Sequence, residues 1–224
     1  MTQLPVQALL ADPALARSLR RYTDGGSRVS YAIQTEAASL PVAGRRGQVL
    51  ASPSTITGFI DRVFQWLDER LKLSFSRKGG LDGAAIAIYR VPRVIGSNPF
   101  TVGMTSSMKR RFDLQWRESD RRTALNWSEQ ATIVHEIGHT LGLSHPFDRP
   151  YDKRWTTGDT IMSYNENRQD KPWFSSTDLQ ALQRIWGAET GNQAKELGWP
   201  GQTWENGSWW GANQPTSLEG WSSG

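Results

Sequence analysis

Apolar residues recur at helical spacing in four stretches of the chain. A helix is predicted over 57–71, capped by a Ser or Thr of 54–57, because six apolar side chains fall on one face: Phe59, Ile60, Val63, Phe64, Leu67 and Leu71. A second helix is predicted to begin at Asn126, since Glu129 three positions later completes a pattern close to a capping box. The last helix opens within residues 175–178 and ends at Gly187, and a short amphipathic helix is expected within 5–21.

Shorter segments with alternating or β-rich composition predict strands. The first covers residues 29–33, and others are expected over 73–76, 84–91, 100–105 and 112–116. Because these strands lie between predicted helices, the pattern favours an α+β fold in which a mixed sheet carries helices. Pro99 and Gly103 suit an edge strand, so residues 100–105 are expected at the edge of the sheet.

The chain of 224 residues has the length of one domain with a tail. Residues 198–224 contain five Trp and six Gly but no Lys or Arg, without helix or strand periodicity. We therefore divide the sequence into an N-terminal extension over 1–24, a main domain over 25–190 and a Trp/Gly-rich tail over 191–224. The tail is expected to anchor on its own domain through Trp side chains, with glycan or partner binding as the alternative. Whether residues 1–24 act as a prosegment stays open.

Composition excludes several classes of protein. No apolar run approaches the roughly 18 residues of a membrane span. The absence of Cys excludes disulfides, thiolate metal ligands and a cysteine nucleophile. The charge, 26 Lys and Arg against 22 Asp and Glu, is spread along the chain, so no nucleic-acid partner is expected. No signal peptide is seen in residues 1–21, and a monomer is expected although the sequence does not set the oligomeric state.

All three histidines of the chain lie within eleven positions, from His135 to His145. On a helix, His135 and His139 fall on the same face and can bind one ion. Glu136 lies next to His135 and can reach a water at that ion without binding the ion. Gly142 permits a positive φ that ends the helix, so the chain can turn and present His145. Three neutral imidazoles and an open fourth position predict a catalytic zinc site.

A second motif, Thr160-Ile161-Met162-Ser163-Tyr164, follows with its Met 17 positions after the third histidine. Together the two motifs resemble the metzincin zinc metallopeptidases, in which a turn holds a Met beneath the metal. Pro146 directly after the third histidine and the Met-Ser-Tyr order resemble the serralysin-like branch, within a catalytic domain of serralysin-like or matrixin-like type. The resemblance covers about residues 29–187 and is specific only in 135–164.

The resemblance implies a zincin fold of the α+β class: a mostly parallel, twisted sheet with an active-site helix and a C-terminal helix. It also implies one catalytic Zn²⁺ on the three histidines, with Glu136 as general base and then general acid in peptide-bond hydrolysis. Tyr164 is expected to hydrogen-bond the transition state, and Met162 to pack beneath the ligands. The substrate is expected to be a peptide or protein that adds a strand at the edge over 100–105.

The chain departs from both branches of this family. It has no calcium-binding repeat domain of the serralysin kind, and no Cys or spare His for the latency and second zinc of the matrix metallopeptidases. The family leaves room for structural Ca²⁺ and for secretion, but the sequence shows neither, so localisation stays open.

Specificity is expected to come from a pocket walled by residues 162–174. Trp155, Trp173 and Phe174 either line that pocket or belong to the core, and the basic charge balance favours acidic substrates. Two rival interpretations remain: a zinc-stabilised module that binds peptide or glycan through the tail, and a zinc hydrolase of a non-peptide amide. Glu136 argues against the first, because a structural zinc site needs no base at that place.

Overall fold

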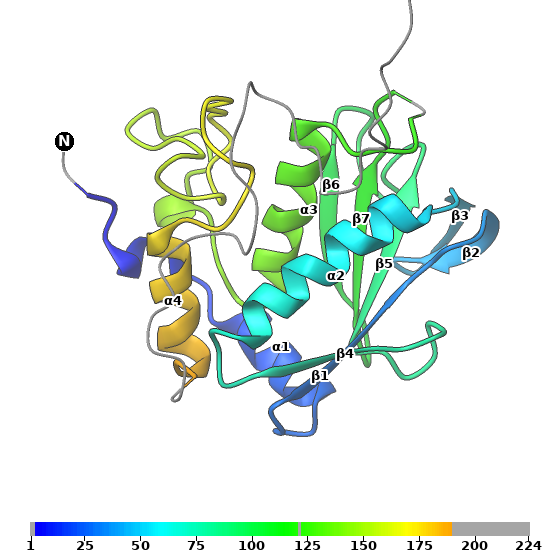
Figure 1. Cartoon of the computed structure of the whole chain (residues 1–224), viewed down its shortest axis with the longest axis horizontal. Coiled ribbons are helices and arrows are strands. Elements are labelled where there is room, and N and C mark those ends of the chain that lie inside the picture. Colours follow the sequence, from blue (N-terminus) through cyan, green and yellow to red (C-terminus); the bar gives the residue numbers. More distant parts are fainter. Residues whose placement is uncertain (1–2, 121, 190–224) are drawn as a thin grey trace, which may run out of the picture. The chain divides into compact units, whose positions relative to one another are not determined.

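A computed structural model describes residues 3–120 and 122–189 of the chain (Figure 1). Its central sheet has five strands. The strand order is β4 (Ser74–Arg77), β1 (Arg28–Ile33), β5 (Ile86–Val91), β7 (Phe112–Arg117) and β6 (Gly103–Ser107). The first four strands run parallel, and β6 pairs antiparallel with β7 at the edge. The expected mixed, mostly parallel sheet is therefore confirmed, although its edge strand begins at Gly103 and not at Phe100.

Four α-helices occur in the described residues: α1 (Ala14–Tyr22), α2 (Ser54–Asp68), α3 (Trp127–Thr140) and α4 (Ser176–Trp186). Asn126 and Glu129 form the expected capping box, so α3 begins where the sequence predicted. α4 also begins at a capping box, formed by Ser175 and Asp178. The expected Ser or Thr cap of α2 is wrong, because Pro53 occupies the N-cap position and supplies no side-chain hydrogen bond.

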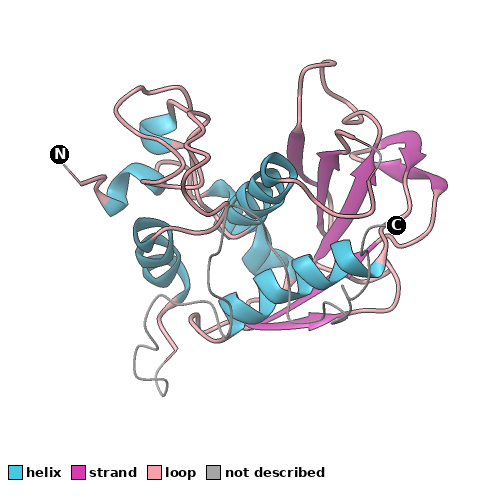
Figure 2. Ribbon diagram, turned by 45° about the horizontal axis from the view of Figure 1, so that its top comes forward, coloured by secondary structure: helices cyan, strands magenta, loops and turns pink. Residues whose placement is uncertain are grey.

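Different elements pack against the two faces of the sheet. Because side chains alternate along β5, Ile88 faces the main core while Tyr89 faces a second, smaller cluster. Helices α2 and α3 supply the main core on one side of the sheet (Figures 1 and 2). A hairpin of β2 (Ala38–Val42) and β3 (Arg45–Val49) covers the second cluster. The central strands β5 and β7 are thus buried on both faces, as is usual for parallel strands.

The sequence pattern did not predict this hairpin. Its turn is Ala43-Gly44, with φ values of 49° and 75°, and Ala is an unusual residue in that conformation. The Asp113 carboxylate of β7 accepts a hydrogen bond from the Ala43 N–H (2.9 Å). A contact from a distant strand therefore supports a turn that local residue preferences do not predict.

Residues 3–24, the described part of the expected N-terminal extension, pack into the main core. Leu4, Leu9 and Leu19 are almost fully buried there. The expected helix over 5–21 is divided into the 3₁₀ helix η1 (Val6–Leu9) and α1. The division falls around Pro13, which has no N–H to continue a helix from the preceding turn.

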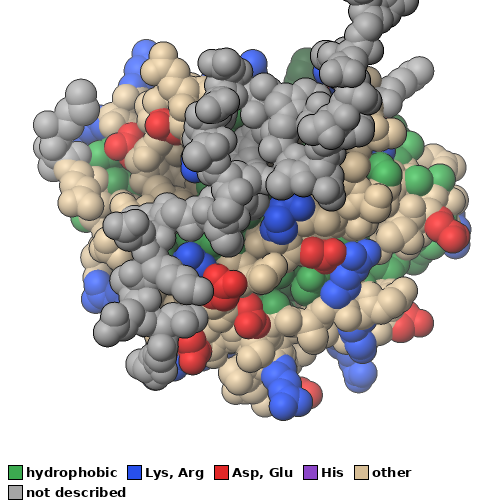
Figure 3. Space-filling view, viewed as in Figure 1, with side chains coloured by type: hydrophobic (Ala, Val, Ile, Leu, Met, Phe, Trp, Pro, Cys, Tyr) green, Lys and Arg blue, Asp and Glu red, His purple; other side chains and the backbone are tan. Residues whose placement is uncertain are grey.

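No helix of the described residues is long and apolar enough to cross a membrane. On the face shown in Figure 3, basic and acidic side chains are interspersed where described atoms are visible. The tail expected over 191–224 lies outside the described residues.

Candidate metal centre

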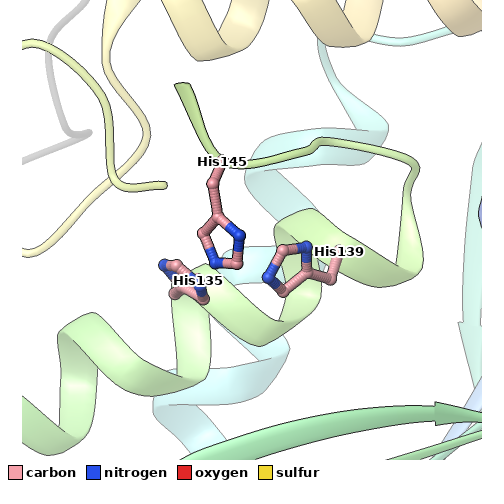
Figure 4. Close-up of side chains that lie close together, drawn as sticks. All are labelled: His135, His139 and His145. Atoms are coloured by element: carbon pink, nitrogen blue, oxygen red, sulfur yellow. The ribbon is translucent and has the colours of Figure 1, made fainter. Parts of the chain in front are cut away.

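Three histidine rings converge at the end of α3 (Figure 4). His135 and His139 lie one turn apart on this helix, and His145 enters from the bend that follows it. One ligand atom from each ring lies within 4.8 Å of the others, so the group could hold a metal ion. Within residues 3–120 and 122–189, no other group of three or more His, Cys, Asp or Glu could do so.

Gly142 makes the bend after α3, as the sequence predicted. Its φ is 98°, a conformation that side chains with a Cβ rarely adopt. Steric crowding also requires glycine at position 142, because a Cβ there would lie 2.8 Å from the Ala16 Cβ of α1. The N-terminal segment therefore packs directly against the bend that presents His145.

Hydrogen bonds set the tautomer of the two helix histidines. His135 Nδ1 lies 2.8 Å from the Ile161 carbonyl oxygen, and His139 Nδ1 lies 2.8 Å from the Leu143 carbonyl oxygen. A neutral ring that donates through Nδ1 keeps its lone pair on Nε2, where a metal binds.

The Nε2 atoms of two of the three histidine rings have no hydrogen-bond partner in the described residues. His135 Nε2 and His145 Nε2 are buried, and neither makes a hydrogen bond within the described residues. Buried polar atoms are nearly always satisfied, so these two indicate a ligand. Three imidazoles form the donor set that zinc and neighbouring transition metals prefer, and the residues therefore fit such an ion.

Burial keeps the three imidazoles neutral. It lowers the pKa of His135 well below the ordinary value of 6.5, and proximity to His139 and His145 lowers it further. The pKa of His139 falls to about 4 for the same two reasons, burial first and His145 second. Burial also lowers the pKa of His145. At neutral pH, protons therefore compete weakly for the nitrogens that face the centre.

Glu136 lies beside the histidines, pressed against the edge strand. A Cβ built on Gly103 of β6 would lie 2.7 Å from Glu136 Oε1, so glycine is needed for this approach. The carboxylate is buried, and its Oε2 has no hydrogen-bond partner in the described part of the chain. Burial raises the pKa of Glu136 to about 8, while hydrogen bonding from Thr105 acts in the opposite direction. A cation at the histidines would lower this pKa again.

Met162 packs beneath the histidines. Its side chain is fully buried, and a Cβ on Gly138 would lie 2.8 Å from the Met162 sulfur. Because Gly138 lies between His135 and His139 on α3, the sulfur packs close to the helix turn that carries both histidines. The position that the sequence analysis expected for Met162 agrees with this packing.

A buried carboxylate of α4 supports the same turn. Asp178 is fully buried and accepts hydrogen bonds from the Thr160 hydroxyl and from the Ile161 N–H (2.9 Å). The Ile161 carbonyl in turn lies 2.8 Å from His135 Nδ1. Asp178 thus holds Ile161, the residue whose carbonyl orients His135. Sequence analysis identified this residue only as part of a helix start, because its second role depends on a contact across the fold.

Tyr164 lies at the open side of the cluster. Its ring centroid is 4.9 Å from that of His145 and 5.4 Å from that of His135. The Tyr164 N–H donates to the Pro150 carbonyl (2.8 Å), which holds the ring beside Tyr151. Burial raises the pKa of Tyr164, with smaller effects from Glu136 and Tyr151. Its hydroxyl therefore stays protonated at neutral pH and can donate a hydrogen bond.

A cavity of about 510 Å³ opens beside His135 and Glu136. Its walls come from α3, from the residues leading into β6 and from the two loops after α3: Asn98, Phe100, Thr101, Val102, Gly103, Ser128, Ala131, Thr132, Tyr151, Thr157, Ile161, Ser163, Tyr164 and Glu166. Phe100 is 87% exposed and Tyr151 is 71% exposed. The sequence analysis assigned no role to Tyr151, since an aromatic residue in a polar loop gives no signal of its own.

The structure bears on two expectations about this cavity. Trp155 and Phe174 are buried in the main core and Trp173 packs against it, so none of the three lines the cavity. Phe174 instead stacks on Trp66 of α2, with 5.8 Å between the ring centroids, and Trp173 meets Phe59 and Trp66 of the same helix edge to face. The expected preference for acidic substrates finds no basic side chain here, because the described lining includes the carboxylates of Glu136 and Glu166 but no Lys or Arg.

Comparison with known proteins adds little to this description. No family model matches the sequence, and no curated protein matches it. Among solved structures, the chain is similar to one described as the GM1-bound form of the ECX AB5 holotoxin. The identity is 12%, the alignment covers 75% of this chain and 84% of that chain, and the TM-score is 0.46. A similarity this low bears on neither fold family nor function.

Proposed function

We propose that this protein is a zinc-dependent metalloendopeptidase with a metzincin-like catalytic domain. The observation that carries the proposal is the convergence of three neutral histidines, two with unpartnered Nε2 atoms, beside the buried carboxylate of Glu136. The turn holding Met162 against Gly138 supports the comparison with metzincins, because that packing is independent of the histidine spacing.

The three histidines would hold the ion. Bound zinc would supply a Lewis acid that polarises the scissile carbonyl and acidifies a water. Glu136 takes a proton from the attacking water as general base and then transfers it to the leaving amine as general acid. The lack of a partner for Glu136 Oε2 leaves that oxygen free for this proton. A purely structural metal site would gain nothing from a buried, unpaired carboxylate, which is costly to place there.

Tyr164 would stabilise the charge that develops on the carbonyl oxygen. Its ring borders both His135 and His145, and its hydroxyl remains a donor at neutral pH. A hydrogen bond that forms only in the transition state contributes to kcat, typically about 3 kcal/mol for an oxyanion donor. This role rests on the resemblance and on the placement of the ring.

The cleft favours an extended polypeptide as substrate. β6 pairs with β7 only, so its other edge has no strand partner in the described residues, and Gly103 at its start lines the cavity. An extended segment could add there as a further strand. Phe100, Val102 and Tyr151 expose apolar surface around the cavity, at 87%, 49% and 71%. We therefore expect a preference for substrates with large apolar side chains near the cleaved bond.

Cleavage of an unfolded protein tests the proposal. Purified protein with one equivalent of zinc is incubated with reduced, denatured casein, with and without a chelator, and the new termini are sequenced. We expect cleavage at internal peptide bonds that the chelator abolishes. Glu136→Gln should bind zinc equally and lose at least a hundredfold in rate. Zinc binding without any cleavage would favour the binding-module interpretation, and cleavage that survives both the chelator and Glu136→Gln would disprove the proposal.

A further inference from the structure

The third histidine is held differently from the other two. His135 and His139 each have a ring nitrogen tied to a backbone carbonyl, at 2.8 Å in both cases. His145 has no such bond within residues 3–120 and 122–189, so the direction of its ring depends on the course of its own backbone and on ring contacts such as that with Tyr164. The bend over 141–145 therefore contributes to where the third ligand points.

The N-terminal segment holds this bend at three places. The Ser144 N–H donates to the Leu9 carbonyl (2.8 Å), and the Ser144 hydroxyl accepts from the Asp12 N–H (3.0 Å). The Ala16 Cβ fills the space next to Gly142, where an added Cβ would lie 2.8 Å away. Ser144 is 5% exposed and immediately precedes His145, so these contacts act directly beside the ligand.

The same segment is anchored elsewhere in the fold. Arg20 donates to the Ile185 carbonyl (2.7 Å) and lies over the Trp186 ring at 4.4 Å. Trp186 in turn donates from its indole N–H to the Leu141 carbonyl (2.8 Å) at the start of the bend. Leu9 and Leu19 are fully buried in the core. The contacts with the bend therefore come from a firmly placed support.

We propose that residues 4–20 form a brace that positions His145 for the metal and belong to the working enzyme. On this proposal, which rests on the metal site of the proposed function, weakening the brace loosens one ligand while the other two stay in place. The segment would then be required for full metal affinity, the opposite of a prosegment whose removal activates the enzyme.

Ser144→Ala in the full chain tests the brace, because it removes the acceptor for the Asp12 N–H and leaves every histidine intact. Tyr22→Phe is the matched control: it removes a hydroxyl of α1 that bonds to Ser107 and to the Met108 carbonyl, away from the bend. Ser144→Thr keeps the hydroxyl and should restore the wild-type behaviour. Gly142→Ala, which forces the bend against Ala16, provides a second and stronger perturbation.

The readouts are the zinc dissociation constant, measured by competition with a chromophoric chelator, and the visible absorption of the Co²⁺-substituted protein. We expect Ser144→Ala to weaken zinc binding about tenfold and to alter the Co²⁺ spectrum, since groups that orient ligands typically contribute 10–100-fold. Tyr22→Phe should change the melting temperature of the metal-free protein but neither readout.

The brace would be overturned if Ser144→Ala had the zinc affinity and the Co²⁺ spectrum of the wild type. It would also be overturned if Ser144→Ala and Tyr22→Phe changed these two readouts equally. A wild-type chain that binds no zinc would overturn both the brace and the proposed function. Zinc binding that depends on Ser144 in a chain that cleaves no peptide would uphold the brace and reject the peptidase.

Discussion

Gly103 of the edge strand and Glu136 of α3 approach so closely that a methyl group at position 103 would lie 2.7 Å from Glu136 Oε1. The same position would be 2.5 Å from the Thr132 side chain on the preceding turn of α3. The edge strand β6 therefore confines the Glu136 carboxylate against its own helix, α3. The placement of the proposed base depends on the absence of one side chain in a different element.

Gly103→Ala should displace this carboxylate. We expect kcat for peptide cleavage to fall at least tenfold with zinc stoichiometry unchanged, because a shift of about 1 Å in a catalytic group can cost a hundredfold in rate. Gly79→Ala is the matched control, since a Cβ there meets nothing within 4 Å. Wild-type kcat in Gly103→Ala would argue that Glu136 is not the base or that its position is not critical.

The stability of the metal-free protein should depend on pH through Glu136. Burial raises the pKa of this residue from 4.5 to about 8, so its stabilising neutral form is fully present below pH 4.5 and is lost as the pH rises through about 8. Glu136→Gln cannot ionise. The unfolding free energy of Glu136→Gln minus that of the wild type should therefore increase between these pH values, by up to about 1.4 kcal/mol per pH unit.

Chemical denaturation of both proteins in the presence of a chelator, at several pH values, measures this difference. A difference that stays constant with pH would show that Glu136 titrates alike in the folded and unfolded chains.

His139→Ala should abolish stoichiometric zinc binding. Two imidazoles remain in this variant, and no other described group of three His, Cys, Asp or Glu could replace the third ligand. Metal analysis after dialysis should give about one zinc per chain for the wild type and less than a tenth of that for the variant. Full occupancy in His139→Ala would place the metal elsewhere.

Tyr164→Phe should lower kcat more than it raises KM. Removing a hydrogen bond that exists only in the transition state leaves substrate binding in the ground state largely intact. We expect a loss of about a hundredfold in kcat, with KM within threefold of the wild type. Steady-state kinetics on one peptide decides this, with Tyr22→Phe as the control outside the cleft. A change confined to KM would limit Tyr164 to substrate binding.

The short-range features of this protein could be predicted from its sequence. Capping residues at Asn126 and Glu129 and the spacing of His135 and His139 act within one or two helical turns, so local geometry determines them. The positive φ of Gly142 was predictable for the same reason. The mixed sheet followed from the order of predicted helices and strands, and its edge strand from Pro99 and Gly103, whereas the mostly parallel order was expected from the family resemblance.

Contacts between distant segments decided the rest. The Ala43-Gly44 turn forms against Asp113, and Tyr151 reaches the cleft because Pro150 is bonded to Tyr164. The brace joins Leu9 to Ser144, which are 135 positions apart in the chain. Local residue preferences carry no information about such pairs, because their energy arises only when the whole chain brings the two segments together. The sequence by itself thus determined which three histidines could hold a metal, and only the tertiary structure decided what holds each of them in place.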